Sequence, residues 1–398
     1  MRLPPLLSPL PPAAVRRLVV PLATAVAAGT AAASALASVG ISFVPANGAN
    51  YSHAIRRASA IRLIVVHVTE GTYGGTIAWF RNPHARCSAN YVVSREGAIT
   101  QMVADRHPAW HAGNAWVNAH SVGIEHEGLT GLAGTFTDAE YRASAELVAR
   151  LMRHYLLPID RRHLIGHNQV PDPFHPGLFG GYSHHTDPGR YWDWRRYLTY
   201  VRSYARGVVP PPRFDVATTG VAFEQTVKGS VPWSATPTGA SIDHVDFLVD
   251  GHVRDTQQTA PYAFGGGAWD TTRETNGRHM LTTRAVATDG SSVVSTIVVT
   301  VKNPPIKILA LTLVEGQTVT GPVRLEARLS GKPLRVEFLV DGVLRDTQTA
   351  APYAFGGASG MWDTTQETPG PHTLVVRAIG PTGKTAASRT VHVVVTTP

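Results

Sequence analysis

A repeat in the second half of the chain is the feature that most limits what it can fold into. The seven residues from Val245 to Gly251 recur almost unchanged 91 residues later as 336–342, and 260–266 recur at the same offset as 351–357. Short strand-like runs in each copy are separated by Asp-Gly and glycine-rich turns, a pattern typical of small β-sandwiches. The repeat therefore predicts two tandem all-β modules, residues 214–303 and 304–398.

These modules resemble the bacterial immunoglobulin-like domains that are attached to secreted and cell-surface enzymes. Their repeated aromatic and acidic residues can either stack on sugar or fill the core and shape turns. We favour the core, because buried tryptophan and tyrosine commonly anchor such sandwiches. The residues concerned are Tyr262, Trp269, Asp270, Tyr353, Trp362 and Asp363.

The first half of the chain has a different pattern. A chain of 398 residues is too long for one core of typical size, and residues 51–206 alternate strand and helix signals. The run 61–68 predicts a central strand, 91–94 and 98–103 predict a hairpin, and 137–155 and 191–206 predict helices. We expect a multidomain protein whose first domain, 51–206, is α/β with a mixed central sheet flanked by helices. A short linker at 38–50 precedes it, and a proline-rich linker at 207–213 follows it.

The amino-terminal segment, residues 1–37, has the features of an export signal. Arg16 and Arg17 precede an uncharged, alanine-rich stretch, and Ala35-Leu36-Ala37 is a candidate cleavage site. The paired arginines match the twin-arginine route loosely, so the general secretory route is an equal alternative. An uncleaved membrane anchor is the other interpretation. We favour cleavage, since the segment is only mildly apolar.

Charge and cysteine content indicate which partners and which covalent cross-links the protein can have. The formal charge of +8 falls to +5 without residues 1–37, where three arginines and no acidic residue lie. This balance suits an anionic surface such as a cell wall, while no basic run or base-stacking motif indicates nucleic acid. Cys87 is the only cysteine, so the chain forms no internal disulfide. We interpret it as a small buried thiol rather than a ligand or nucleophile.

Three distant segments each contain a side chain suited to holding zinc. His67 ends one apolar run, His167 ends another, and Asp187 stands before a Pro-Gly pair. Two imidazoles and one carboxylate leave a fourth tetrahedral position for water, as in catalytic rather than structural sites. Zinc lowers the pKa of a water ligand to about 7 and polarises a carbonyl group. A hydrolase is therefore the first hypothesis, with a carboxylate of the segment 121–128 available to transfer protons.

Five motifs in order resemble the type 2, zinc-dependent N-acetylmuramoyl-L-alanine amidases, relatives of phage lysozyme-type amidases and peptidoglycan recognition proteins. They are Val66-His67, Trp110-His111-Ala112-Gly113, residues 121–128, Gly166-His167 and Thr186-Asp187-Pro188-Gly189. The resemblance covers nearly all of residues 51–200. It implies zinc bound by His67, His167 and Asp187, with Glu125 as the catalytic carboxylate and His185 as the group that stabilises the oxyanion.

Several residues compete for these roles. His184 is the alternative to His185, which we favour for its spacing from the ligand Asp187. Glu127 is the alternative to Glu125, because strand alternation sends both to one face and His126 to the other.

Other residues near the motifs are candidate substrate contacts. His111 either lines the substrate groove or makes a structural hydrogen bond. Asn90, where relatives often carry histidine, and Trp110 are further candidates. His163 and His175 are interpreted as surface or supporting groups. The loop 168–184 is longer than in compact members of the family and either shapes a groove or is an ordered surface excursion.

The resemblance implies an exported enzyme that hydrolyses the amide bond between N-acetylmuramic acid and the L-alanine of the stem peptide. The expected cofactor is Zn²⁺ and the expected partner is peptidoglycan or muropeptides. We expect a monomer that is secreted or bound to the bacterial wall. The alternatives are a peptidoglycan-binding protein without catalysis and an adhesion protein. Non-enzymatic relatives typically lack a full ligand set, whereas His67, His167 and Asp187 are all present.

Overall fold

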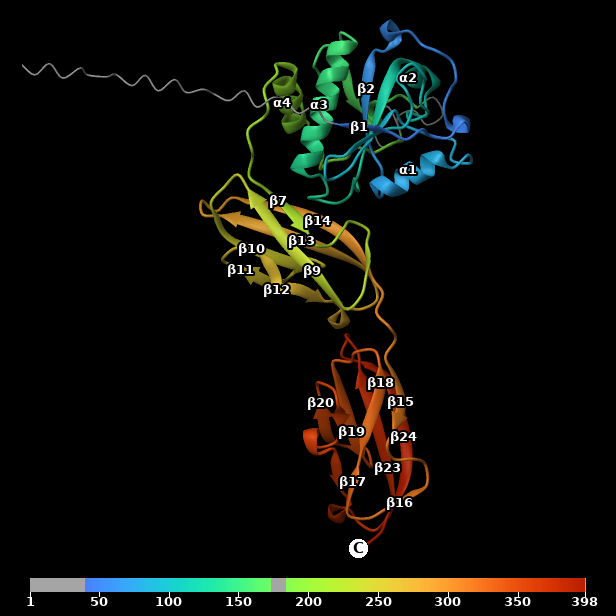
Figure 1. Cartoon of the computed structure of the whole chain (residues 1–398), viewed down its shortest axis with the longest axis vertical. Coiled ribbons are helices and arrows are strands. Elements are labelled where there is room, and N and C mark those ends of the chain that lie inside the picture. The colour runs from blue at the N-terminus through green and yellow to red at the C-terminus, as the bar shows by residue number, and fades with distance from the viewer. Residues whose placement is uncertain (1–39, 173–183, 398) are drawn as a thin grey trace, which may run out of the picture. The chain divides into compact units, whose positions relative to one another are not determined.

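A six-stranded mixed sheet organises the amino-terminal part of the protein (Figure 1). The computed structural model describes residues 40–172 and 184–397. The strand order is β1-β4-β3-β5-β2-β6. The strands span Ile41–Phe43 (β1), Leu63–Val68 (β2), Tyr91–Val93 (β3), Ile99–Gln101 (β4), Ser121–His126 (β5) and Leu164–Gly166 (β6). β3, β5, β2 and β6 are parallel neighbours, while β3 and β4 form the predicted antiparallel hairpin, so the mixed sheet is confirmed.

Two long helices cover one face of this sheet. α3 spans Asp138–His154 and α4 spans Trp194–Ala205, and they pack side by side (Figure 1). Their apolar residues share a core with Ile64 and Val66 of β2 and with Val122 and Ile124 of β5. Burial of this apolar surface is the main force that fixes the helices on the sheet.

The opposite face carries shorter elements. The helices here are α1 (Tyr73–Arg81) and α2 (Ala115–His120). The described residues of the domain also form the 3-10 helices η1 (Gly48–Asn50), η2 (Ala58–Ala60) and η3 (His167–Gln169). Val65 of β2 packs here with Val117 of α2 and with Val170. Because side chains alternate along a strand, His67 lies on the same face as Val65. His67, the first predicted metal ligand, therefore lies on the face of the sheet opposite α3 and α4.

Two local predictions differ from the structure. Residues 41–43, expected in a linker, form β1 and pair with β4, so the sheet begins before residue 51. α4 begins three residues later than predicted, because the Asp193 side chain caps it by accepting the N–H of Arg196. The side chain of Thr137 caps α3 in the same way, by accepting the N–H of Glu140.

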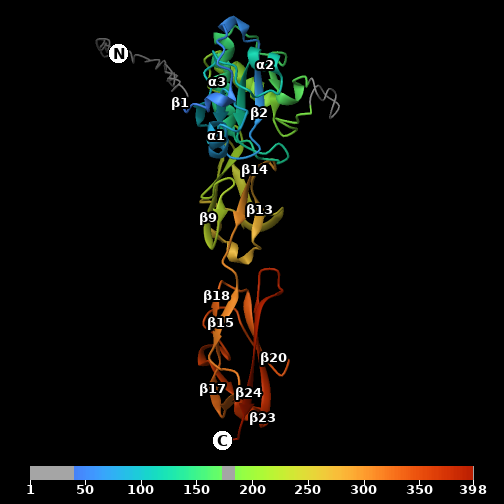
Figure 2. The same cartoon turned by 90° about the vertical axis from the view of Figure 1, so that its right-hand side faces the viewer.

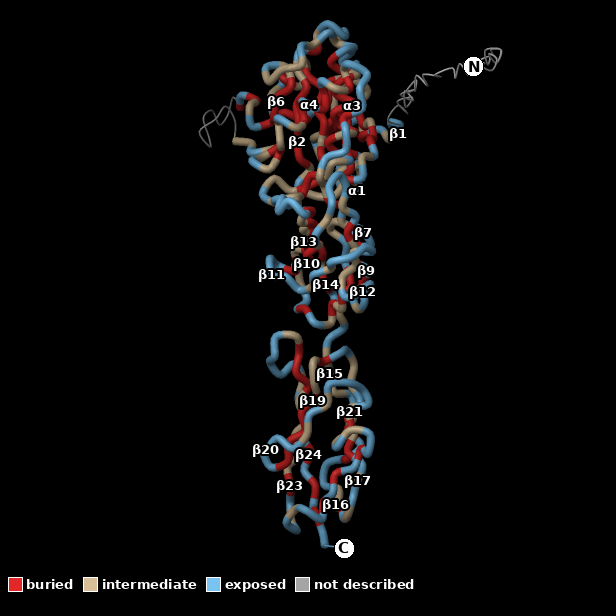
Figure 3. The backbone as a smooth tube through the Cα atoms, turned by 90° about the vertical axis from the view of Figure 1, so that its left-hand side faces the viewer, coloured by how far each residue is buried: buried red, intermediate tan, exposed pale blue. Residues whose placement is uncertain are grey.

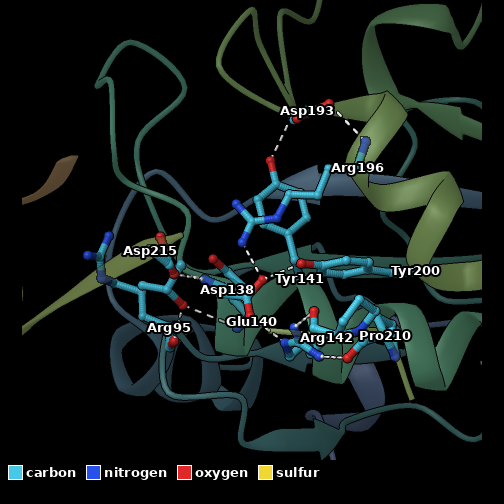
Figure 4. Close-up of polar contacts among 12 residues, drawn as sticks. Arg95, Asp138, Glu140, Tyr141, Arg142, Asp193, Arg196, Tyr200, Pro210 and Asp215 are labelled. Carbon is cyan, nitrogen blue, oxygen red and sulfur yellow. Dashed lines mark hydrogen bonds and ion pairs between the residues drawn. The ribbon is translucent and has the colours of Figure 1, made fainter. Parts of the chain in front are cut away.

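Asp138, the first residue of α3, joins the two long helices (Figure 4). Its carboxylate accepts hydrogen bonds from Arg142, Arg196 and Tyr200, with the Tyr200 hydroxyl at 2.6 Å. Burial would raise the pKa of Asp138, but these donors outweigh it and lower that pKa. A negative charge here also suits the positive end of the helix dipole. The network therefore fixes the pairing of α3 with α4.

Residues 215–301 form the first β-sandwich. One sheet has the order β11-β10-β13-β14-β8 and the other β12-β9-β7, so that β9 and β13, both labelled in Figure 2, belong to different sheets. The elements are β7 (Asp215–Thr219), β8 (Thr226–Val227), β9 (Ser230–Thr238), β10 (Ile242–Val249), β11 (His252–Gln257), β12 (Ala263–Asp270), η5 (Thr271–Arg273), β13 (Gly277–Ala287) and β14 (Ser292–Val301). Trp233 and Phe247 are fully buried between the sheets.

Residues 307–395 form the second sandwich on the same plan. Its large sheet, β20-β19-β23-β24-β16, repeats the order of the first module, and β15-β18-β21 and β17-β22 form the other side. The elements are β15 (Lys307–Leu311), β16 (Gln317–Val319), β17 (Pro322–Arg324), β18 (Glu326–Ser330), β19 (Arg335–Val340), β20 (Val343–Gln348), β21 (Tyr353–Ala354), η6 (Gly357–Ser359), β22 (Met361–Asp363), η7 (Thr364–Gln366), β23 (Gly370–Ile379) and β24 (Thr385–Val395). Buried residues run along β19 and β23 (Figure 3).

The repeated aromatic and acidic residues of the modules serve the fold. Trp269 and Trp362 are each only 2% exposed, so neither ring is available to a sugar. The side chains of Asp270 and Asp363 cap the 3-10 turns that follow them. The two repeated tyrosines, Tyr262 and Tyr353, are partly buried against the same cores. The core interpretation of the repeat is therefore confirmed for the tryptophans.

Within residues 40–172 and 184–397, no helix combines the length and the apolar character needed to cross a membrane. The predicted export signal at 1–37 lies outside the described residues. His175 and most of the loop 168–184 also lie outside them.

Candidate active site

The ends of three adjacent parallel strands bring predicted site residues together. His67 lies opposite Glu125 in the β2–β5 ladder, and His167 follows β6, the other neighbour of β2. Because parallel strands end at one edge of a sheet, these side chains meet although they are distant in sequence. Asp187 is held at the same edge by a hydrogen bond of 2.9 Å from the N–H of Asn168 to its carbonyl oxygen.

His67, His167 and Asp187 form a compact cluster of metal-suited donors. Their ligand atoms lie within 4.8 Å of one another. Nδ1 of His67 is 3.4 Å from Oδ2 of Asp187, and Nδ1 of His167 is 3.1 Å from Oδ1. Both histidines are buried, and two imidazoles with one carboxylate are a donor set that suits zinc. The residues present therefore fit the ion that the sequence predicts.

Burial and neighbouring charge set the protonation of this cluster. Burial and the adjacent His167 lower the pKa of His67 to about 4. Burial alone would raise the pKa of Asp187, but its close contacts with the rings of His167 and His67 outweigh burial and hold that pKa below its usual range. The imidazole of His67 is therefore neutral and the carboxylate ionised near neutral pH. A metal requires these states of its ligands.

Glu125 is the carboxylate that faces the cluster. It lines the same cavity as the three candidate ligands, and within the described residues its buried Oε2 has no hydrogen-bond partner. Burial, followed by the charges of Asp187 and Glu70, raises the pKa of Glu125 to about 8. A carboxyl group shifted towards neutral pH inside a cavity has the properties of a general acid–base residue.

Glu127, the alternative to Glu125, is engaged elsewhere. Its Oε1 accepts the backbone N–H of Tyr73 and its Oε2 that of Arg95, each at 2.9 Å. These bonds hold the start of α1 and the turn between β3 and β4. His126 points to the opposite face of the sheet, as predicted, and is fully buried. The geometry therefore favours Glu125 as the acid–base group.

His185 and its alternative His184 both line the cavity. The ring of His185 stacks on that of His167 with centroids 3.5 Å apart, whereas Nδ1 of His184 pairs with the carboxylate of Asp172. Asp172, His184 and His185 form a second group whose ligand atoms also lie within 4.8 Å of one another. This group is less buried than the first and adjoins residues 173–183. His185 is thus the nearer neighbour of the candidate ligands.

His111 lies directly behind His67. It borders the cavity but is only 8% exposed. Its Nδ1 is 2.9 Å from Nε2 of His67, and its Nε2 is 3.0 Å from Oγ of Ser121. Of the two interpretations that the sequence leaves open, these contacts favour the structural hydrogen bond.

Asn90 and Trp110, the other predicted substrate contacts, do not line this cavity. Asn90 is fully buried, and its side chain accepts the N–H of Gly123 and donates to the carbonyl of Val103. Both groups of the Asn90 amide are hydrogen-bonded to the backbone inside the domain, so this side chain cannot contact substrate. The prediction that Asn90 binds substrate is therefore wrong. Trp110 is 38% exposed outside the cavity, so it is not assigned a contact there.

The cavity continues past Glu125 on the side of α1. The part that contains the cluster has a volume of about 520 Å³, and an adjoining part of about 350 Å³ shares Val68 and Glu125 with it. Trp79, 51% exposed, lines this second part. The sequence does not identify Trp79 as a site residue, because its pattern predicts no helix at α1. A larger cavity of about 940 Å³, bordered by Arg62 and Trp116, lies at the start of β2 and contains none of the predicted site residues.

Metal-suited ligands and an acid–base carboxylate at one edge of a mixed sheet are the arrangement of a metal-dependent hydrolase. Residues 57–190 match the family model described as N-acetylmuramoyl-L-alanine amidase, and residues 310–376 match that of a bacterial Ig domain. N-acetylmuramoyl-L-alanine amidase A of Achromobacter lyticus is 36% identical over 170 residues, which cover 39% of this chain and 90% of that protein. The chain belongs to the N-acetylmuramoyl-L-alanine amidase family.

Two further proteins named as amidases also match this chain. The 1,6-anhydro-N-acetylmuramyl-L-alanine amidase AmpD of Haemophilus influenzae is 34% identical over 123 residues, which cover 29% of this chain and 60% of that protein. Among solved structures, the N-acetylmuramoyl-L-alanine amidase LysC from Clostridium intestinale URNW is 15% identical with a TM-score of 0.31. That match covers 41% of this chain and 97% of the LysC chain.

Proposed function

We propose that this protein is a zinc-dependent enzyme that acts on peptidoglycan outside the cytoplasm. As a member of its family it is a hydrolase of the amide bond between N-acetylmuramic acid and the L-alanine of the stem peptide. The observation that carries the proposal is the convergence of His67, His167 and Asp187 beside Glu125 in one cavity. A binding protein without catalysis would not need this complete set.

Each residue of the cavity has a role in this proposal. His67, His167 and Asp187 would hold the ion, which when bound would supply an activated water and polarise the scissile carbonyl. Glu125 takes a proton from the attacking water and passes it to the departing amine. His185 donates a hydrogen bond to the carbonyl oxygen as negative charge builds there. Burial and the nearby His167 lower the pKa of His185 to about 4, and the neutral ring still carries one N–H donor.

We further propose that the protein is secreted or associated with the bacterial wall. Two observations support this location. Residues 1–37 have the composition of an export signal, and the remainder of the chain keeps a net positive charge that favours an anionic surface.

The proposal is tested by incubating the purified full chain with peptidoglycan, with and without a chelator, and analysing the products by mass spectrometry. We expect free stem peptides and intact glycan strands, loss of both products after chelation, and recovery when zinc is restored. Broken glycan strands would instead indicate a glycosidase. Peptide release that persists in a metal-free sample would contradict the role of the ion.

A further inference from the structure

The two ring nitrogens of His67 face in different directions. Nδ1 faces the carboxylate of Asp187 and the candidate metal cluster. Nε2 faces Nδ1 of His111 at 2.9 Å, and both rings are buried. A contact of this length between two neutral imidazoles requires one proton between the nitrogens, carried by one ring and accepted by the other. Which ring carries it decides whether Nδ1 of His67 is free to bind a metal.

The hydrogen bonds of Ser121, which contacts the other nitrogen of the His111 ring, determine which ring carries that proton. Oγ of Ser121 lies 2.6 Å from the carbonyl oxygen of Val117 and 3.0 Å from Nε2 of His111. A carbonyl oxygen can only accept, so the single hydroxyl proton of Ser121 is donated to Val117. Oγ is then left to accept a proton from His111, which must carry it on Nε2.

The remaining assignment follows from this step. With its proton on Nε2, neutral His111 presents a lone pair at Nδ1, and His67 donates its own Nε2–H to that lone pair. Nδ1 of His67 consequently has no proton, and its lone pair points towards Asp187 and the cluster. The carbonyl of Val117 therefore determines the tautomer of His67 through the side chains of Ser121 and His111. This tautomer is the one in which Nδ1 can bind a metal.

We propose that His111 and Ser121 are positioning residues that hold His67 in its metal-binding tautomer. The proposal rests on the proposed function only in taking His67 as a ligand of the ion. Both ring nitrogens of His111 are occupied by these contacts, so the ring has no nitrogen left for a substrate.

The backbone around His111 is built to keep its ring in this place. A Cβ atom on Gly123 would lie 2.4 Å from the imidazole, so only glycine lets the ring lie against β5. Oδ1 of Asn118 accepts the backbone N–H groups of His111 and Ala112, at 3.1 and 2.8 Å. These contacts link the Trp110–Gly113 and 121–128 motifs, which lie on either side of α2.

Histidine-ring nitrogen NMR of the metal-free full chain tests the tautomer directly. We expect His67 to be protonated at Nε2 and bare at Nδ1, with His111 protonated at Nε2. Protonation of His67 at Nδ1 would overturn the proposal. This readout involves no hydrolysis, so it can fail while the proposed function holds, and it can succeed in a protein that hydrolyses nothing.

Zinc affinity, measured by competition with a chromophoric chelator, tests the consequence. We expect His111→Leu to weaken zinc binding by about 10- to 100-fold, the usual effect of losing a hydrogen-bond partner of a ligand. His111→Gln, which offers one acceptor and one donor, should recover much of the loss, and Ser121→Ala should weaken binding less than His111→Leu. Unchanged affinity in a folded His111→Leu protein would overturn the proposal.

Two controls keep the affinity test interpretable. His84→Leu removes an exposed histidine outside the cavity and should leave zinc affinity unchanged. Circular dichroism of each metal-free variant shows whether it folds. If His111→Leu does not fold, Ser121→Ala is compared with the native chain instead. Equal zinc affinity of these two proteins, together with protonation of His67 at Nδ1, would overturn the proposal.

Discussion

At the scale of single residues, the carboxylates of Glu125 and Glu127 have different surroundings. Among the described residues, the buried Oε2 of Glu125 has no hydrogen-bond partner, which suits the proposed transfer of protons by this carboxyl group. We predict that Glu125→Gln lowers kcat by about 10²- to 10⁴-fold, because the amide cannot act as a base, while bound zinc is retained. Turnover of a muropeptide and the zinc content of the purified protein measure the two effects.

Glu127→Gln is the matched control for this prediction, since it makes the same chemical change two residues away. Both oxygens of Glu127 accept backbone N–H groups, and an amide nitrogen cannot accept one. The variant should therefore lower the thermal midpoint and leave kcat of the folded protein nearly unchanged. If Glu127→Gln stopped turnover in a fully stable protein and Glu125→Gln did not, the assignment of the acid–base group would be wrong.

His185 gives the second prediction at this scale. A donor to the developing oxyanion is typically worth about 3 kcal/mol, so His185→Ala should lower kcat by roughly 10²-fold or more. Because His185 is stacked on a candidate ligand rather than part of the first cluster, zinc affinity should fall much less. The comparison of kcat with zinc competition measures both. An equal loss of affinity and turnover would instead make His185 a ligand, and His184→Ala is the control.

The sequence predicts some of the site and misses the rest for a physical reason. Each candidate ligand ends a strand-like run or precedes a Pro-Gly turn, so local pattern was enough to find it. The role of Asn90 depends on Gly123, 33 residues away, and that of His111 depends on His67, 44 residues away. A local sequence pattern does not include partners that are so far apart along the chain. Only the folded structure shows that they are in contact.

At the scale of elements, each β-sandwich contains one buried histidine. It ties β13 to the turn between β10 and β11 in the first module, and β23 to the turn between β19 and β20 in the second. His279 has Nδ1 at 2.7 Å from Asp250 and Nε2 at 2.8 Å from the carbonyl of Thr275. His372 repeats this with Asp341 at 2.6 Å and the carbonyl of Thr368 at 2.7 Å. Carboxylate and carbonyl oxygens both accept, so each ring fits best when both of its nitrogens carry protons.

These pairs predict how the stability of the modules depends on pH. Burial opposes a raised pKa for His279, but the Thr275 carbonyl and Asp250 outweigh it; for His372 the Thr368 carbonyl leads, and both pKa values are raised. The stabilisation is complete below about 6.5, the unfolded value, and is lost as pH rises through the raised folded values. We predict that calorimetric midpoints of the modules fall with rising pH, and fall less in the double variant His279→Gln, His372→Gln.

The control for this prediction is the transition of the catalytic domain, which should move equally in native and variant chains. A variant whose module midpoints follow the native pH dependence would show that these rings do not stabilise the turns through their charge.

Long periodic elements were predicted well, and short ones were not. The stripe of apolar residues on α3 specifies both the helix and the face it buries. β1 has only three residues, all exposed, and exists because the edge of β4 offers it hydrogen-bonding groups. Such a strand is defined by its neighbour rather than by its own composition. A linker was therefore the natural prediction.

At the scale of the whole molecule, the modules account for about half of the chain, and their contribution to wall binding can be separated from catalysis. The repeated tryptophans lie in the cores rather than on a surface. We therefore predict that residues 213–398 alone do not sediment with purified walls, whereas the full chain carrying Glu125→Gln does. A folded 213–398 fragment that pelleted with walls would favour the adhesion alternative for this half.

The ladder between β2 and β5 has a consequence for how enzymes of this architecture can diverge. His67 and Glu125 are opposite each other in one set of backbone hydrogen bonds, so their spacing owes nothing to the length of the segments that join them. Insertions and deletions in those segments would alter which molecules the cavity admits while His67 and Glu125 stay in register. Evolution can in this way change the substrate specificity of the cavity while the pairing of His67 with Glu125 is kept.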